Sequence, residues 1–268
     1  MREAYRSVKR TMSVLNALAE HPDGLDIVGV ARLTELDKST AYRFLSSLVK
    51  VGAVRQEPTG RFRLSWKMFE IGSTLLLSQG IDFKRVYPPL EELSASTGQS
   101  TNMAIIDGNE VVIVATVNSQ GIIQTVFRMG ARLPLYCTAL GKAVLAHMDA
   151  AALRRYLDSV ELTPNTEHTL VNKDALMNDL RTTRERGFSF NNEEYCLGIY
   201  CIASPVFNFF DEPFATVGAS GHSDRFILTP SMGREIIRVA RLFSEYYGAR
   251  PERLAYFDDC LLKLDSRA

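Results

Sequence analysis

Residues 37–50 form the segment whose pattern most restricts what this chain can fold into. Its apolar side chains recur at steps of three and four residues, the spacing of one stripe along an α-helix: Ala41, Phe44, Leu45, Leu48 and Val49. The opposite face carries side chains that can form hydrogen bonds, only one of them charged: Ser39, Tyr42, Arg43 and Ser46. A face of this composition suits a helix that lies in the major groove of DNA. The alternative is an ordinary amphipathic helix with a solvated face.

The neighbouring segments favour the first interpretation. Residues 7–20 have the pattern of an amphipathic helix that ends at a Pro-Asp-Gly turn. A second, shorter helix follows, with Ile27, Val30, Ala31 and Leu36 as its apolar contacts. Residues 53–64 then predict two short strands around a Pro-Thr-Gly turn, and alternation places Arg61 and Arg63 together on one side of the second strand. Three helices followed by an arginine-bearing hairpin predict a winged helix-turn-helix.

The composition is that of a soluble globular chain with an uneven distribution of charge. Hydrophobic residues make up 46% and charged residues 23% of the sequence. No apolar run approaches the roughly 18 residues of a membrane helix, and the first residues lack the apolar core of a signal peptide, so we expect a cytoplasmic location and no membrane partner. Residues 1–66 contain 11 Lys and Arg against 7 Asp and Glu, whereas the remainder contains 20 against 24. A basic head on an acidic body indicates a nucleic-acid-binding first domain.

Neither metal chemistry nor catalysis is predicted. The cysteines include no Cys-x-x-Cys pair, and we expect free thiols: Cys137, Cys196, Cys201 and Cys260. The four histidines lie at no recognised ligand spacing, so neither a metal site nor a cofactor is expected. Gly141-Lys142 resembles the end of a phosphate-binding loop, but Tyr136 and Ala143 replace its required Gly and Ser or Thr. Residues 218–222 resemble a nucleophile elbow with His222 in place of the second Gly. We therefore assign no catalytic residue and expect no enzyme.

Beyond the predicted wing, the pattern becomes mixed α and β. Residues 66–79 predict a helix whose apolar stripe is too broad for a lone surface helix, so we expect it to pack on a partner as well as on its own domain. Further helices are predicted at about 83–97, 138–148, 149–159, 172–187 and 229–247, and strands at 100–107, 110–117, 122–129, 199–207 and 214–220. The expected fold is α+β with two domains: a winged helix-turn-helix over 1–65, a linker helix over 66–80, and a mixed domain over 81–268.

Several blocks occur in an order that other winged-helix proteins lack. The first domain contains Ser7-Val8-Lys9-Arg10, Asp37-Lys38-Ser39-Thr40-Ala41-Tyr42-Arg43 and the wing Gly60-Arg61-Phe62-Arg63-Leu64. The second contains residues 132–143, Arg184-Glu185-Arg186-Gly187-Phe188, Asn192-Glu193-Glu194, residues 198–206 and Ser220-Gly221. From about Ser7 to Tyr246 the chain thus resembles the isocitrate lyase regulator (IclR-type) family of bacterial transcription factors.

This resemblance implies a GAF-like effector domain with an antiparallel sheet, dimers joined through the N-terminal region and often paired into tetramers, and a palindromic operator near a catabolic operon. Repression is expected rather than activation. The DNA contacts implied are Lys38, Ser39, Thr40, Tyr42 and Arg43, with Arg61 and Arg63 of the wing on the DNA backbone. The effector contacts implied are Leu133, Ala139, Leu140, Asn191, Cys201, Gly218 and Ser220. Two positions depart from the family pattern: Asn191 replaces a frequent Asp, and Gly218 replaces a Ser that some members carry.

The implied pocket suggests how a small carboxylate or aromatic acid is held. Its walls are apolar, and hydrogen bonds come from the Ser220 hydroxyl, the Asn191 amide and the backbone N–H groups near Ala139 at a helix start. The set contains no Lys or Arg, and Lys142 lies a turn away, so dipoles are expected to balance the ligand's charge.

Alternatives remain for the pocket and for the whole chain. Cys201 has the alternative of a small buried hydrophobe, Asn191 that of a surface residue, and the apolar walls that of ordinary core. The chain has the alternatives of a ligand-binding or enzymatic domain with a DNA-binding head, and of a DNA binder without an effector.

Overall fold

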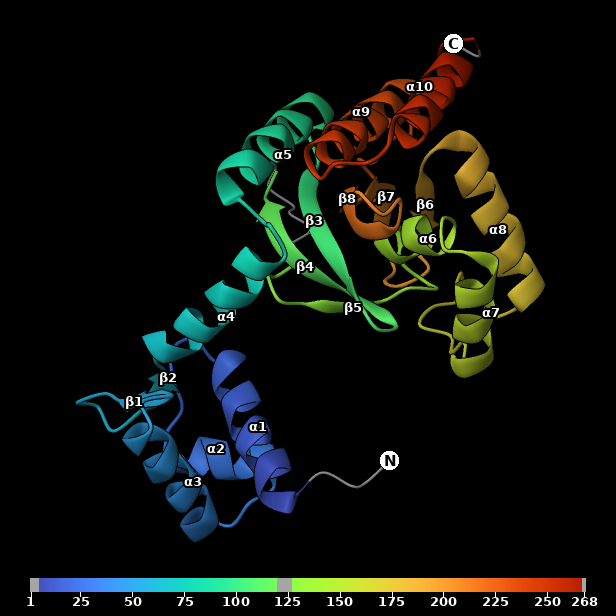
Figure 1. The fold of residues 1–268 in the computed structure, drawn as a ribbon. Helices are drawn as coiled ribbons and strands as arrows, with labels where there is room; N and C mark the ends of the chain where they lie inside the picture. The colour runs from blue at the N-terminus through green and yellow to red at the C-terminus, as the bar shows by residue number, and fades with distance from the viewer. Residues whose placement is uncertain (1–4, 120–126, 267–268) are drawn as a thin grey trace. The chain divides into compact units, whose positions relative to one another are not determined.

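The structure, a computed structural model, describes residues 5–119 and 127–266. It divides the chain into two compact units, Met1–Asp82 and Phe83–Ala268 (Figure 1). The strand expected at 122–129 falls for the most part outside the described residues. Within the described ranges, no helix is both long and apolar enough to cross a membrane.

The first unit has the element order of a winged helix-turn-helix. It consists, within the described residues, of α1 (Arg6–Ala19), α2 (Ile27–Thr34), α3 (Lys38–Lys50), β1 (Val54–Gln56), β2 (Phe62–Leu64) and α4 (Trp66–Ser78). Side-chain caps define where the short helices begin: Asp26 accepts the N–H of Gly29 before α2, and Asp37 accepts the N–H of Thr40 before α3. The winged helix-turn-helix predicted from the sequence is confirmed.

The core of the first unit is formed by the apolar sides of α1, α2 and α3 against the wing. Val14, Val30, Leu45 and Phe62 are buried at its centre. Phe62 also pairs through its backbone with Leu25, the residue that follows the first turn, which fixes the hairpin to the helices. The apolar stripe predicted for α3 is right at its centre and wrong at its end, where Val49 is exposed.

The second unit is built on an antiparallel sheet with the strand order β5-β4-β3-β8-β7-β6. Its strands are β3 (Ser100–Asp107), β4 (Glu110–Val117), β5 (Arg132–Pro134), β6 (Ser189–Asn192), β7 (Ile199–Phe207) and β8 (Pro213–His222). Two hairpins, β3–β4 and β7–β8, meet at the centre through the pairing of β3 with β8. This pairing brings residues about 120 positions apart in sequence into one ladder.

Helices cover both faces of this sheet. α5 (Phe83–Thr97) and α9 (Pro230–Tyr246) pack on one face, and α10 (Pro251–Asp265) lies along α9 (Figure 1). On the other face α6 (Ala139–Leu145) packs on β7 and β8, with α8 (Lys173–Arg186) against it and α7 (Ala150–Ser159) nearby. The α+β expectation is confirmed.

Three elements differ from the sequence prediction. β5 and β6 were not predicted as strands, because three or four residues are too few to show a period. The predicted regular structure also ended at about residue 247, whereas α10 follows from Pro251. α10 begins with Pro at its first turn, followed by Glu252, which is a recognisable helix start.

Gly141 is the point of closest approach between α6 and the rest of the unit. Every residue of α6 is buried. A Cβ at position 141 would overlap the backbone of Leu135, with the Leu135 carbonyl carbon at only 2.6 Å. Because backbone atoms cannot rotate aside, α6 must retreat if residue 141 gains any side chain.

We predict that Gly141→Ala destabilises the second unit, although Ala is normally the better helix former by about 1 kcal/mol. Overpacking against backbone should outweigh that gain and lower the free energy of unfolding by about 2 kcal/mol. Gly72→Ala in α4 is the matched control, since a Cβ there meets nothing within 4 Å. Urea unfolding of both variants decides the matter: a Gly141→Ala protein as stable as wild type would refute the close approach.

Candidate functional sites

The first candidate site is the outer face of α3, whose start is organised by Asp37. The Asp37 carboxylate accepts the Ser39 hydroxyl at 2.6 Å and the Thr40 N–H at 2.8 Å. These hydrogen bonds, the Ser39 hydroxyl first, hold the pKa of Asp37 well below its usual range. The Ser39 hydroxyl therefore serves the helix cap in this structure, which the sequence analysis did not foresee.

Tyr42 and Arg43 project from the first half of α3. Tyr42 is exposed to 55%, unusual for a large aromatic side chain, and Arg43 and Lys38 are exposed as well. No ion pair to Arg43 occurs among the described residues. Thr40 is half-buried beside them. Lys38, Tyr42 and Arg43 therefore face solvent, and DNA could contact Arg43 without first breaking an ion pair in the described part of the chain.

The wing arginines have different surroundings. Arg61 is exposed, yet its Nη1 donates to the carbonyl oxygens of Asp23 and Gly24, each at 3.2 Å. Arg63 is half-buried, its side chain lies against Gly24, and its Nε is buried and has no hydrogen-bond partner among the residues that the structure describes. Both arginines therefore help to hold the wing to the first turn.

Arg55 is a wing residue that the sequence analysis missed. In the hairpin register it stands directly opposite Arg63, so both side chains lie on one face of the wing. Like charges opposite each other cost stability in a sheet, and the ion pair of Arg55 with Glu57 at 3.1 Å offsets part of this cost. Such a pair of cations favours an anionic partner. The signal was present in the sequence as a third arginine in the hairpin.

The second candidate site is a cavity between the start of α6 and the sheet. All seven residues implied as effector contacts line it: Leu133, Ala139, Leu140, Asn191, Cys201, Gly218 and Ser220. Its non-atom space is about 370 Å³ including open solvent, but it is narrow, and the centre of a water molecule has only about 20 Å³ in which to move. A ligand larger than water therefore requires the walls to separate.

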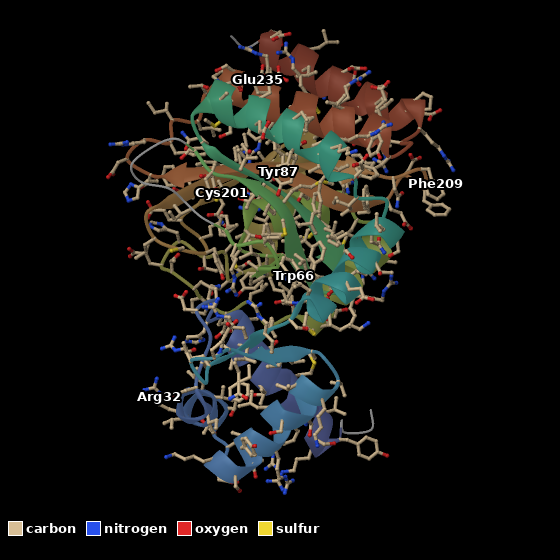
Figure 2. The ribbon with its side chains drawn as sticks, turned by 90° about the vertical axis from the view of Figure 1, so that its left-hand side faces the viewer. Arg32, Trp66, Tyr87, Cys201, Phe209 and Glu235 are labelled. Carbon is tan, nitrogen blue, oxygen red and sulfur yellow. The ribbon has the colours of Figure 1, made fainter. Side chains whose placement is uncertain are left out.

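Strand register explains why these residues meet. Asn191, Cys201 and Ser220 are directly paired across β6, β7 and β8, so their side chains share one face of the sheet. Gly218 lies two residues along β8 on the same face, beneath Leu140 of α6. Cys201, labelled in Figure 2, marks the position of this row in the second unit.

The polar groups of this row are neutral. Burial raises the pKa of the Cys201 thiol to about 12, so it stays protonated. Asn191 Nδ2 donates to the Cys137 carbonyl oxygen at 2.6 Å. The expectation that the Asn191 amide is available for a ligand is therefore corrected in part: one N–H already holds the loop before α6. Ser220, by contrast, is buried and its hydroxyl has no partner among the described residues.

Lys142 does not contribute to the cavity. Its side chain is fully buried, and its Nζ lies 2.6 Å from Glu194 Oε1, 2.7 Å from the Phe190 carbonyl oxygen and 2.9 Å from Asp179 Oδ2. Burial raises the pKa of Glu194, and Lys142 opposes that shift. Arg186 belongs to the same buried cluster: burial lowers its pKa, and the charges of Asp179 and Glu194 raise it. Two cations and two carboxylates thus balance one another here and tie the segment around Glu194 to α6.

The cavity includes residues that the sequence analysis did not identify. They are Asn102, Phe127, Thr138, Tyr195, Cys196, Ile199, Ile202 and Ala219. The Thr138 hydroxyl is used twice, donating to the Pro134 carbonyl and accepting the Gly141 N–H as the cap of α6. Asn102 is a polar residue inside a buried strand, but its neighbour across the sheet is Gly218, which the sequence alone does not reveal. In the described part of the chain no group of three or more His, Cys, Asp or Glu side chains could hold a metal ion.

Comparison with known proteins gives a consistent result for both units. Residues 7–58 match the model of the IclR helix-turn-helix domain, and residues 76–242 match that of the bacterial transcriptional regulator IclR C-terminal domain. The HTH-type transcriptional regulator XynR of Escherichia coli is 34% identical over 222 residues, which are 82% of this chain and 87% of that protein. The transcriptional repressor IclR of the same organism is 30% identical over 248 residues, 91% of this chain and 90% of that protein.

Solved structures share the fold over nearly the whole chain. IclR from Thermotoga maritima has a TM-score of 0.71 at 28% identity and covers 93% of this chain and 99% of its own. An IclR homologue from Microbacterium hydrocarbonoxydans, solved with 4-hydroxybenzoate, has a TM-score of 0.74 at 18% identity and covers 96% of this chain and 99% of its own. XynR and IclR of Escherichia coli are both transcriptional regulators. This chain belongs to the IclR family of bacterial transcriptional regulators.

Proposed function

We propose that this chain represses a catabolic operon by binding a palindromic operator through α3, and that a small carboxylate or aromatic acid in the α6 cavity switches it. The observation that carries the proposal is the pairing of two features. The first unit presents the exposed side chains of Tyr42 and Arg43 on α3, and the second contains a cavity lined by polar atoms that have no partner among the described residues. Effector-independent DNA binding would need no such cavity.

In this proposal Tyr42 and Arg43 reach base edges or flanking phosphates, with Lys38, Ser39 and Thr40 at the start of the helix. The N-terminal residues of a recognition helix are those that meet base edges in the major groove. Arg63, together with Arg55 opposite it, contacts the DNA backbone, while Arg61 supports the wing through its bonds to the first turn.

We predict that Arg43→Ala weakens operator binding by about 10- to 100-fold, the loss of 1–3 kcal/mol typical of a base contact, with little change on random DNA. Arg63→Ala should weaken both DNAs alike and reduce the salt dependence of binding, because a phosphate contact carries no sequence information. Fluorescence anisotropy at several salt concentrations measures both effects.

Arg181→Ala is the control for these two variants, since it removes the same charge from the exposed surface of α8 in the other unit. Because Arg63 is half-buried, its variant is also checked for an unchanged unfolding transition. Operator affinity unaltered in both Arg43→Ala and Arg63→Ala would exclude this surface as the DNA-binding site.

The cavity has the features of a small-molecule site. Its walls are mostly apolar, and a few buried hydroxyl, amide and thiol groups face it without any lining Lys or Arg among the described residues. The IclR homologue solved with 4-hydroxybenzoate supports an aromatic acid as one class of effector. Because the cavity is narrow, binding must separate α6 from the sheet or move the segment around Tyr195, and a ligand acts only through such a difference between two states.

We predict that Ser220→Ala weakens effector binding about tenfold while leaving effector-free operator binding intact, because it removes a buried hydroxyl that has no partner among the described residues and is available to a ligand. Asn191→Leu should also weaken the response, by releasing the Cys137 carbonyl that Asn191 now holds. Calorimetry with the effector, together with operator anisotropy, tests both. Wild-type effector affinity in both variants would place the ligand elsewhere.

Self-association is proposed through α4. Five large side chains of this helix are exposed: Trp66, Phe69, Ile71, Leu75 and Leu77. Figure 2 shows Trp66 on this helix, and no residue of α4 is buried. An apolar surface of this extent indicates an interface, and a two-fold dimer would present two recognition helices to the half-sites of a palindrome.

We predict that Leu75→Glu lowers the dimer fraction at micromolar concentration by at least tenfold, because a carboxylate would have to be buried in the interface. Leu262→Glu on α10, where Leu262 is exposed to 67% against 59% for Leu75, is the matched control and should leave assembly unchanged. Light scattering is the measurement. A monomeric wild-type protein would refute the interface.

A further inference from the structure

The face of the sheet beneath α6 is unusually polar for a buried surface. Along β3, β8, β7 and β6 it carries Ser100, Ser220, Cys201 and Asn191 in one row, and Asn102, Gly218, Ala203 and Ser189 in the next. Polar side chains at such depth require partners to offset their loss of water.

Three of these side chains have protein partners. The Ser100 hydroxyl accepts the Ser119 N–H, the Ser189 hydroxyl donates to the Ala139 carbonyl oxygen at 2.6 Å, and Asn191 holds the Cys137 carbonyl. The bonds of Ser189 and Asn191 fix α6 and its preceding loop to the sheet, whereas the bond of Ser100 holds the residue that follows β4 by two positions.

Asn102 and Ser220 differ from them. Asn102 is 2% exposed and its Oδ1 has no hydrogen-bond partner in the described part of the chain, and the same holds for the Ser220 hydroxyl at 1% exposure. Both residues line the cavity. The unsatisfied atoms of this face that border the cavity are therefore placed where a ligand could complete them.

The Asn102 amide fits beside Gly218 because Gly218 has no side chain. A Cβ at position 218 would lie 3.0 Å from Asn102 Oδ1 and 2.8 Å from Leu140 Cδ2. The Asn102 amide therefore occupies the place that a side chain at 218 would take, between the sheet and α6. A hydrogen-bond acceptor projects into an apolar space because its neighbour has no side chain.

Asn102 Oδ1 and the Ser220 hydroxyl determine which functional group of a ligand could bind between them. An amide oxygen accepts hydrogen bonds and repels a carboxylate oxygen, so it calls for an O–H or N–H donor. A hydroxyl group can donate to Asn102 and accept from Ser220 at once. The residues of 120–126 add no Lys, Arg or His by sequence, and Lys142 is committed to Glu194 and Asp179.

We propose that Asn102 and Ser220 form a specificity pair that recognises a hydroxyl group of the effector, so that the effector is a hydroxylated organic acid. The inference rests on the proposed effector cavity and names the substituent that the cavity selects. Asn102 is the residue that distinguishes a hydroxylated acid from the same acid without the hydroxyl.

The test is a cycle of protein variants against matched ligands, measured by calorimetry on the full-length protein. Two ligand series are used: benzoate with 3- and 4-hydroxybenzoate, and pentanoate with the corresponding five-carbon polyhydroxy acid. Wild type should bind a hydroxylated member of one series at least about tenfold more tightly than its parent, as expected for completing buried polar atoms. The series that shows this preference tells whether the hydroxyl stands on a ring or on a chain.

Asn102→Leu should reduce that preference to within about twofold while retaining affinity for the parent acid. Thr216→Val is the matched control: Thr216 is fully buried on β8 with an unpaired hydroxyl, but it does not line the cavity, so the preference should persist. Asn102→Ala serves if the larger Leu disturbs folding, which operator binding and the unfolding transition report.

Asn102→Leu also tells which end of the amide meets the ligand. If the Asn102 N–H donors held the ligand's carboxylate, this variant would lose affinity for the parent and the hydroxylated acids alike, and that outcome would overturn the proposal.

Other outcomes separate this inference from the proposed function. Equal wild-type affinity for parent and hydroxylated acids in both series, or a preference that persists in Asn102→Leu, overturns the specificity pair and leaves the effector cavity standing. Operator binding without binding of any of these acids overturns the pair, whereas the contacts proposed for α3 are tested separately by the operator-binding variants.

Discussion

The contact between α6 and the backbone of Leu135 governs the geometry of the second unit. Because Gly141 has no side chain, α6 lies directly against the Leu135 backbone in the segment that leads into the helix, and every residue of α6 is buried. The helix also packs on β7 and β8, where Gly218 lies beneath Leu140. The narrow cavity lies between the start of this helix and the sheet, with polar side chains in its floor.

Charge in this region is confined to one place. Lys142 extends from the buried helix to Glu194 and Asp179, with Arg186 in the same cluster, and the signs cancel. A buried ion pair contributes little net stability, but removal of one partner is costly because a charge is then stranded. The cluster therefore acts as a strict constraint on the segment around Glu194, which also supplies Tyr195 and Cys196 to the cavity wall.

Local sequence patterns were enough to predict many of the helices and strands. Residues whose role depends on contacts between distant parts of the chain could not be predicted in this way. The period of α3 and the hairpin of the wing are encoded within a few residues, so they could be recognised. The ring of implied effector residues came from family blocks, and the structure brings its members together. Asn102 could not be found in this way, because its significance depends on pairing with Gly218, more than a hundred residues away. The inward turn of Arg61 and the burial of Lys142 likewise depend on tertiary contacts, although a lone Lys in the apolar run of α6 was a signal for the second.

The self-neutral cluster at Lys142 has a consequence for how such regulators diversify. The charged groups of this cluster hold the fold together, whereas the unpaired groups of the proposed effector cavity are a neutral amide and a neutral hydroxyl. In that proposal a substitution at Asn102 or Ser220 changes the ligand preference without leaving an uncompensated charge in the interior. Mutation can thus explore new inducers while the scaffold stays intact, and a duplicated gene could acquire a different metabolic signal through one or two changes on a single face of the sheet.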